Sequence, residues 1–204
     1  MRLIDRFIGE PDFSDEHHID IHAPADLVLA VATKMDIQAL PIVRGLIWIR
    51  GTVMGVRSTP RKATALLGEL KSLGWRVLAH VPGRLYVLGV LARPWLADAG
   101  FHGVDAEDYV ACCEPDAVKI VVSLDAQPIA ATWTRFVTET YVKATDAVAL
   151  RKFRPYWFVA SSGIVLIRLV TLRALKRRAE WEFGEQQRAR GAAAEQREAA
   201  PLAL

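Results

Sequence analysis

Cysteine is nearly absent from this chain of 204 residues, in which only the adjacent Cys112 and Cys113 occur. Neighbouring cysteines rarely form a disulfide because the geometry is strained, so a disulfide framework is excluded. The N-terminus lacks the unbroken apolar core of a signal peptide, since acidic residues and Pro11 interrupt it. Both absences are typical of proteins in a reducing compartment, and we expect a cytoplasmic location.

Known catalytic motifs are also missing. The sequence contains no G-x-S-x-G nucleophile elbow, no phosphate-binding loop and no glycine pattern for a dinucleotide. His18, Asp20 and His22 alternate along an expected strand, where two of them could bind zinc. Nothing elsewhere completes a zinc site, so we interpret them as an exposed polar face. We assign no catalytic residue and expect no metal or other cofactor.

No long apolar run is free of charged residues. Residues 156–175 are numerous enough to cross a bilayer, but Arg168 and Arg173 lie inside this stretch. An arginine near the centre of a bilayer is energetically costly. We therefore interpret the stretch as a buried helix of a soluble domain, with attachment to a membrane surface as the alternative.

Apolar residues make up 52% of the chain and charged residues 24%, which is typical of globular proteins and excludes disorder of the whole chain. We expect one domain over residues 1–183 and a flexible tail over residues 184–204. The net charge is +3, and basic residues concentrate between Arg151 and Arg190. Such a segment can bind nucleic acid, anionic lipid or an acidic protein, but it is more often the solvated end of a helix. We expect no nucleic-acid partner.

Strands are predicted where apolar and polar residues alternate, over residues 16–22, 75–81, 85–93, 117–126 and 132–144. Pro82-Gly83 marks a hairpin turn between the second and the third of them. Strands do not alternate with helices in this order, which disfavours a parallel doubly wound sheet. Consecutive strands joined by short turns favour an antiparallel meander, and such a sheet must bury one face. The sequence thus predicts an α+β fold.

Short helices are predicted over residues 25–35 and 61–73, and residues 40–48 are expected to form another short helix or a turn. Thr59 is expected to cap the helix over residues 61–73, with Pro60 as its first helical residue. A long helix begins after Thr145-Asp146 and extends to about residue 182, although Pro155 and residues 161–163 favour breaks in it. It is the only element long and apolar enough to cover the sheet.

Short landmark segments are spread over most of the chain: His22–Pro24, Pro82–Arg84, Gly89, Pro94-Trp95, Thr138–Val142, Ala144–Asp146, Phe153–Trp157, Ser161–Leu169 and Ala179-Glu180. In this pattern, over about residues 13–182, the chain resembles the START-like (SRPBCC) superfamily of polyketide cyclases and lipid-transport proteins, in an uncharacterised bacterial branch. None of the segments is a catalytic signature. Tyr141, which stands where this branch carries arginine, and the extra helix over residues 61–73 both weaken the transfer of a particular ligand.

The resemblance implies the helix-grip fold, in which a curved antiparallel sheet wraps around the long C-terminal helix, with short helices after the first strand. It also implies an apolar pocket between that helix and the concave face of the sheet. The residues expected to line the pocket are Tyr86, Leu88, Val90, Ile120, Val122, Leu124, Phe136, Thr138, Thr140, Phe153, Trp157, Ser161, Ile164 and Arg168. In the alternative interpretation, these side chains simply fill the core.

Some expected pocket residues are polar. A hydroxyl of Thr138 or Thr140 on a buried face needs a partner, which is either a ligand or a backbone carbonyl. Arg168 either holds an anionic group in the pocket or, as we favour, extends out of the helix to solvent or pairs with Glu139 or another acid. Glu139 lies between Arg135 and Lys143 in alternation, which favours an ion-paired surface face over an acid/base group.

These observations predict a carrier or sensor of a small hydrophobic molecule such as a lipid or a polyketide. An enzyme of the cyclase, aromatase or dehydratase type could use the same pocket. A protein that acts through its basic C-terminal helix on a membrane or a partner is the other alternative, and it allows peripheral membrane contact. Both a monomer and a homodimer are compatible with the sequence.

Overall fold

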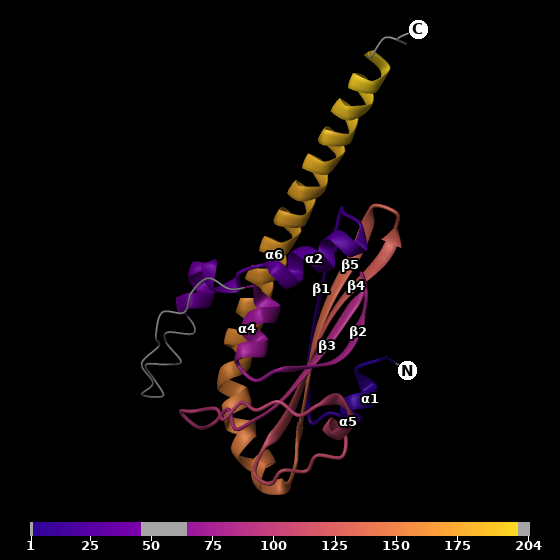
Figure 1. Cartoon of the computed structure of the whole chain (residues 1–204). Coiled ribbons are helices and arrows are strands. Elements are labelled where there is room, and N and C mark those ends of the chain that lie inside the picture. Colours follow the sequence, from indigo (N-terminus) through magenta and orange to yellow (C-terminus); the bar gives the residue numbers. More distant parts are fainter. Residues whose placement is uncertain (1, 46–64, 200–204) are drawn as a thin grey trace.

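A five-stranded antiparallel sheet forms the centre of the molecule (Figure 1). The computed structural model describes residues 2–45 and 65–199. The strands are β1 (Phe13–Ile21), β2 (Arg76–Val81), β3 (Leu85–Ala92), β4 (Val118–Ala130) and β5 (Trp133–Ala144). They lie in the order β1-β5-β4-β3-β2, and each neighbouring pair is antiparallel. The predicted meander is confirmed for β2 to β5, and β1 extends the sheet by pairing with β5.

The turn between β2 and β3 lies where the sequence predicts it. Gly83 has a φ of 67°, a left-handed conformation that glycine adopts without steric cost. The Arg84 amide donates a hydrogen bond to the Val81 carbonyl at 3.0 Å, which closes the turn. Pro82 fixes the backbone just before this glycine, so the Pro-Gly pair accounts for the hairpin.

The helices are α1 (Asp5–Ile8), α2 (Ala25–Lys34), the 3-10 helix η1 (Ile37–Ala39), α4 (Leu66–Ser72), α5 (Ala106–Tyr109) and α6 (Ala147–Ala199). The short helices expected after the first strand are confirmed in α2 and in the helical residues 41–45. α4 matches the end of the helix predicted over residues 61–73. The predicted start of that helix, with Thr59 and Pro60, lies outside the described residues.

α6 is longer and more regular than the sequence predicts. It runs without interruption from Ala147 to Ala199, through Pro155 and residues 161–163. Proline costs the helix a backbone hydrogen bond, but the buried Phe153 and Leu172 hold it against the sheet on either side of the expected breaks. The predicted breaks and the predicted helix end are therefore wrong. The helix continues beyond the sheet through residues expected to form a tail (Figure 1).

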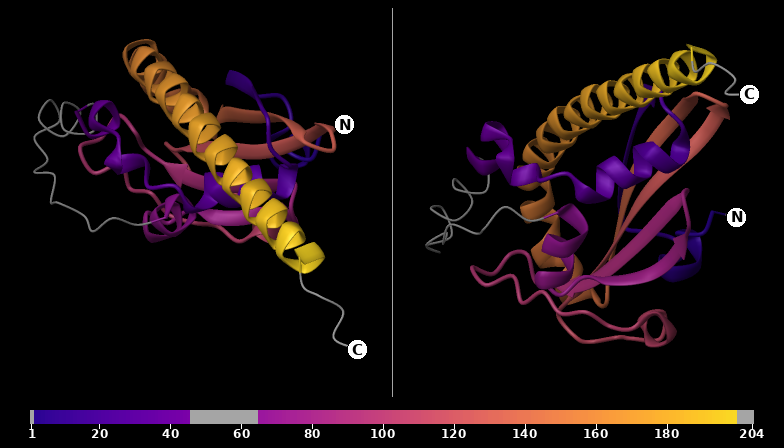
Figure 2. Two further views of the ribbon diagram at one scale, coloured as in Figure 1. Left: turned by 90° about the horizontal axis from the view of Figure 1, so that it is seen from above. Right: turned by 45° about the horizontal axis from the view of Figure 1, so that its top comes forward.

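α6 crosses one face of the sheet, which we call the inner face (Figure 2). An apolar cluster joins that face to α2 and to the C-terminal half of α6 through residues that include Ile21, Val28, Leu29, Leu88, Val90, Phe136, Leu172, Leu175 and Ala179. A smaller cluster of Phe153, Val118 and Val142 joins the start of α6 to the sheet. The expected α+β class and helix-grip arrangement, with the long helix over an antiparallel sheet, are confirmed.

The opposite, outer face of the sheet is covered as well, which the sequence does not predict. Ile4 and Ile8 of the N-terminal segment and Tyr109 of α5 pack on Val121 and Tyr141 from the strands. The single hydroxyl proton of Tyr109 is shared between the carbonyls of two paired strand residues, Val90 at 3.2 Å and Ile120 at 3.0 Å, and burial raises the pKa of this hydroxyl. The prediction that only the C-terminal helix covers the sheet is therefore wrong.

Candidate functional site

A row of four side chains crosses the inner face near its middle. The backbone register pairs Asp15 of β1 with Thr140 of β5, Thr140 with Val122 of β4, and Val122 with Leu88 of β3. Side chains of residues paired across strands lie on the same face of a sheet. The row therefore has a polar edge at Asp15 and Thr140 and an apolar floor at Val122 and Leu88.

Above this floor, the middle of α6 is incompletely covered. Phe153 is 1% exposed and Leu172 is 5% exposed, but no residue of α6 between these two is fully buried. Trp157, Ser161 and Ile164 follow Phe153 at helical spacing, so they lie on the helix face that contacts the sheet. Each of the three is only partly buried. The inward side of α6 is therefore less completely buried in its middle than at Phe153 and Leu172.

The floor is also only partly buried at its centre. Ile120 and Val122 belong to β4, the central strand, and both are only partly buried. Their neighbours on β3, Val90 and Leu88, are fully buried at 0% exposure. α6 and β4 thus both present apolar side chains that pack against the clusters but are only partly buried, and we call the region between them the candidate site.

Arg168 closes the polar edge of this space. Its Nη1 lies 3.0 Å from the Asp15 carboxylate and donates to the Thr138 carbonyl at 3.2 Å, while Nη2 donates to the Thr140 hydroxyl. The Arg168 side chain is only 11% exposed. Burial lowers the pKa of its guanidinium, and the Asp15 carboxylate acts in the opposite direction. The expected pairing of Arg168 with an acid is confirmed, with Asp15 in place of Glu139.

Sequence reasoning missed two residues of this edge, Asp15 and His17. The His17 Nδ1 lies 3.7 Å from the Asp15 carboxylate, and His17 pairs across strands with Thr138. The sequence prediction begins the first strand at residue 16, whereas β1 begins at Phe13. Asp15 and His17 share the alternation of Ile19 and Ile21, and extending that pattern upstream identifies both.

The structure divides the expected pocket residues into two groups. Leu88, Val90, Leu124, Phe136 and Phe153 are buried in the apolar clusters. The others are partly buried apolar or serine side chains and the polar group around Arg168: Tyr86, Ile120, Val122, Trp157, Ser161 and Ile164, with Thr138, Thr140 and Arg168. All strand members share the inner face, but contact with a ligand stays a prediction for every residue of both groups.

No protein-family model matches this chain. No curated protein matches it in sequence. Among solved structures, the chain is similar to the Zhui aromatase/cyclase from Streptomyces sp. R1128, at 14% sequence identity and a TM-score of 0.30. The match covers 82% of this chain and 93% of the other. At that TM-score it has no bearing on the site, and the resemblance to the START-like superfamily stays a prediction.

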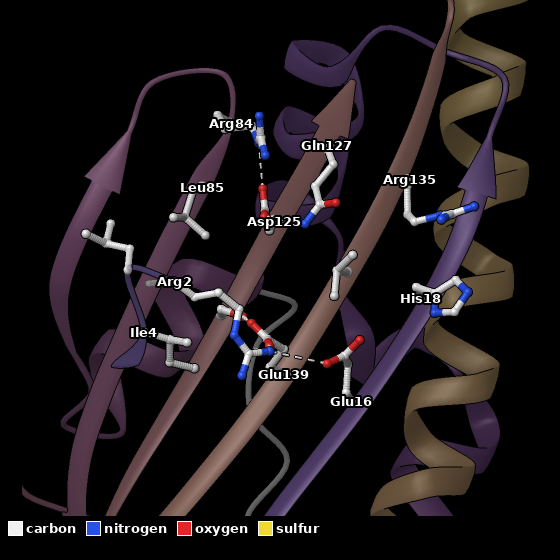
Figure 3. A pocket seen from close by; sticks show the side chains of 13 residues that line it. Arg2, Ile4, Glu16, His18, Arg84, Leu85, Asp125, Gln127, Arg135 and Glu139 are labelled. Atoms are coloured by element: carbon white, nitrogen blue, oxygen red, sulfur yellow. Dashed lines mark hydrogen bonds and ion pairs between the residues drawn. The ribbon is translucent and has the colours of Figure 1, made fainter. Parts of the chain in front are cut away.

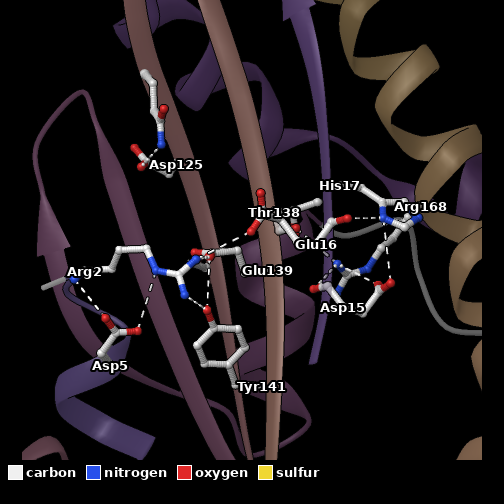
Figure 4. Close-up of polar contacts among 12 residues, drawn as sticks. Arg2, Asp5, Asp15, Glu16, His17, Asp125, Thr138, Glu139, Tyr141 and Arg168 are labelled. Atoms are coloured by element: carbon white, nitrogen blue, oxygen red, sulfur yellow. Dashed lines mark hydrogen bonds and ion pairs between the residues drawn. The ribbon is translucent and has the colours of Figure 1, made fainter. Parts of the chain in front are cut away.

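A second polar cluster lies on the outer face, where Arg2 approaches β5 from the side opposite to Arg168 (Figure 4). Glu139 is 6% exposed, accepts a hydrogen bond from the Ser123 hydroxyl at 2.9 Å and pairs with Arg2. Burial lowers the pKa of Arg2, but Glu139 and Tyr141 raise it above the ordinary value overall; burial and Glu139 also raise the pKa of Tyr141. The expected ion pairing of Glu139 is confirmed, with Arg2 as its partner, but its expected exposure is wrong because the N-terminal segment covers it.

A hollow of about 560 Å³ lies beside this cluster on the outer face (Figure 3). Its acids and bases already compensate one another. Arg84 donates to Asp125 at 2.7 Å, and Arg135, another lining residue, donates to Asp20 at 2.8 Å. With its charges paired, the hollow offers a charged ligand little unsatisfied binding capacity, and we do not assign a function to it.

The candidate metal ligands are dispersed. Asp20 is engaged by Arg135, whose hydrogen bond lowers the Asp20 pKa. The His22 ring packs on Trp133, with ring centroids 4.9 Å apart. Within residues 2–45 and 65–199, no three His, Cys, Asp or Glu side chains gather to hold a metal ion. Cys112 and Cys113 are free thiols.

By length and composition alone, α6 could cross a membrane, and only 11% of its most apolar stretch is buried. The prediction of a buried helix is therefore wrong for the middle of α6. Phe158 is 84% exposed and Val159 is 78% exposed on the side of the helix away from the sheet. The inward side holds Arg168 and its polar partners. This stretch therefore has an apolar, solvent-exposed outward side and a largely buried inward side that includes an ion pair.

Proposed function

We propose that the protein binds a small hydrophobic molecule between α6 and the inner face of the sheet. The observation that carries the proposal is the pair of partly exposed apolar walls, with Trp157 and Ile164 on the helix and Ile120 and Val122 on the central strand. Binding sites for small molecules are concave, mostly apolar and furnished with a few polar groups. This space combines apolar walls with a polar edge at Arg168 and Thr140.

The energetics favour an apolar guest. Burying about 200 Å² of apolar ligand surface contributes roughly 5 kcal/mol at about 25 cal/mol per Å², from which the loss of translational and rotational freedom is subtracted. The side chains of Thr138, Thr140 and Arg168 would set the orientation of a polar group on the ligand. Arg168 is already paired with Asp15, so a neutral polar group fits this edge better than an anion.

Native mass spectrometry of the purified chain tests the proposal. We expect a co-purified molecule of low polarity, released when the protein unfolds. After its removal, we expect saturable binding of fatty acids, sterols or polycyclic aromatic probes. The proposal is wrong if the stripped protein binds none of these probes saturably, or if the only molecule that binds is polar throughout.

A further inference from the structure

The outward side of α6 carries an apolar stripe with cations at both ends. Phe158, Val159, Leu166 and Leu169 are 84%, 78%, 43% and 42% exposed. They recur at helical spacing on the side away from Phe153, so they form one continuous face. Apolar side chains gathered on one surface mark a site of interaction rather than scattered exposure.

Three arginines lie on the same side of the helix as this stripe. Arg151 precedes it, and Arg173 and Arg177 follow it; all three are exposed. None of the three forms an ion pair with a residue in the part of the chain that the structure describes. The sequence has no acidic residue from Ala147 to Ala179. The surface therefore combines an apolar centre with cationic ends.

This charge pattern disfavours a second copy of the chain as the partner. Arg151 lies about 33 Å from Arg173 along the axis at about 1.5 Å per residue. If two stripes paired antiparallel, Arg151 of each would meet Arg173 and Arg177 of the other. If they paired parallel, each arginine would meet its own counterpart. Either arrangement places cation against cation, which is destabilising.

We propose that this stripe docks the protein on the surface of an anionic membrane. An amphipathic helix with aromatic and aliphatic residues on one face and cations beside them lies in the interface of a bilayer with its apolar face immersed. Anionic headgroups attract the flanking arginines, and the acyl region receives Phe158 and Val159. Because Arg168 holds the inward side of α6 to β1, the helix lies on the membrane without crossing it. This proposal does not depend on ligand binding inside the fold.

Co-sedimentation of the full chain with vesicles tests the docking. One set contains phosphatidylcholine alone, and the other also contains about 30% phosphatidylserine, which makes the surface anionic. We expect binding to the anionic vesicles and weaker binding as salt rises. Substituting Arg151, Arg173 and Arg177 together by Gln should weaken binding about a hundredfold, at about fivefold per arginine. Phe158→Ser with Val159→Ser should weaken it about tenfold or more.

Matched controls distinguish an effect of the stripe from an effect of losing any cation or any exposed apolar side chain. Arg188→Gln with Arg190→Gln removes two cations of α6 beyond the stripe, and Val110→Ser removes an exposed apolar side chain near α5. Neither control should change vesicle binding. Circular dichroism establishes folding, and single variants Phe158→Ser and Leu169→Ser replace any double variant that unfolds.

Three results overturn the proposal: absence of binding to anionic vesicles, equal binding by the stripe variants and the wild type, or equal binding to neutral and anionic vesicles. A fourth is a dimer in solution that Phe158→Ser converts to a monomer, since it would assign the stripe to a second copy of the chain.

Discussion

The Arg168 guanidinium on α6 lies 3.0 Å from the Asp15 carboxylate on β1, and this ion pair joins the middle of the long helix to the edge of the sheet. The two side chains are 11% and 16% exposed. The contact is electrostatic, since Asp15 Oδ2 accepts no hydrogen bond within the described residues. Arg168 instead donates to the Thr138 carbonyl and the Thr140 hydroxyl. The pair thus fixes how far α6 lies from the strands at the candidate site.

Removing the charge of Arg168 should destabilise the protein strongly. Arg168→Met leaves the Asp15 carboxylate largely buried without its partner, and breaking a buried pair in this way costs about 3–5 kcal/mol. Urea unfolding measures the loss. Asp15→Asn in the Arg168→Met background should recover part of it, because no uncompensated charge remains. Equal stability of Arg168→Met and the wild type would show that the pair does not hold the helix.

The N-terminal segment should stabilise the fold through Arg2. Arg2→Met leaves the buried Glu139 without its cation, and we expect a loss of about 1 kcal/mol because the Arg2 side chain is itself 56% exposed and screened by solvent. Arg6→Met, an exposed change in α1, serves as the control and should stay within about 0.5 kcal/mol of the wild type. Equal losses in both variants would contradict a specific role for Arg2.

The start of α6 should become less stable in acid. The Asp146 carboxylate accepts hydrogen bonds from the amides of Asp116 at 2.7 Å and Ala149 at 2.8 Å, and these bonds lower the Asp146 pKa below its ordinary value of 3.8. A lowered pKa stabilises the folded state above pH 3.8, and this contribution disappears as the pH falls through the folded-state pKa. At pH 7, Asp146→Ala should therefore lower the melting temperature by a few degrees.

Asp146→Ala also tests the predicted direction of the pH dependence. Thermal unfolding from pH 7 downward should show the difference between the wild type and Asp146→Ala shrinking below about pH 4, as the wild-type carboxyl becomes protonated. A difference that grows in acid would contradict the assignment of Asp146 as an ionised cap.

Local patterns in the sequence predict most of the fold, but long-range contacts limit the prediction of the site. Alternation places Ile120, Val122 and Thr140 on one face, and the structure confirms this placement. The burial of Glu139 depends on Arg2, which is 137 positions away in sequence, and no local pattern reports such a contact. The helical spacing of Ile4 and Ile8 was the one local pattern that could have indicated that the N-terminal segment packs on the sheet.

The continuity of α6 illustrates the same limit. Pro155 favours a break by its own chemistry, yet the helix persists because Phe153 and Leu172 are buried against the sheet on either side of the interruption. Tertiary packing of this kind is invisible in a single sequence. The strand residues of the inner face could be named from alternation, whereas their degree of burial could not.

Two adjacent serines of α6 provide the most direct test of the proposed binding space. Ser161 lies on the inward side and is partly buried, and Ser162 is exposed on the outward side. Ser161→Phe should fill the space between α6 and Val122, whereas Ser162→Phe adds the same side chain facing solvent. Titration with a fluorescent fatty acid compares the two variants after circular dichroism has established that both are folded. We predict that Ser161→Phe abolishes saturable binding while Ser162→Phe retains it; equal binding by both would contradict a ligand site between the helix and the sheet.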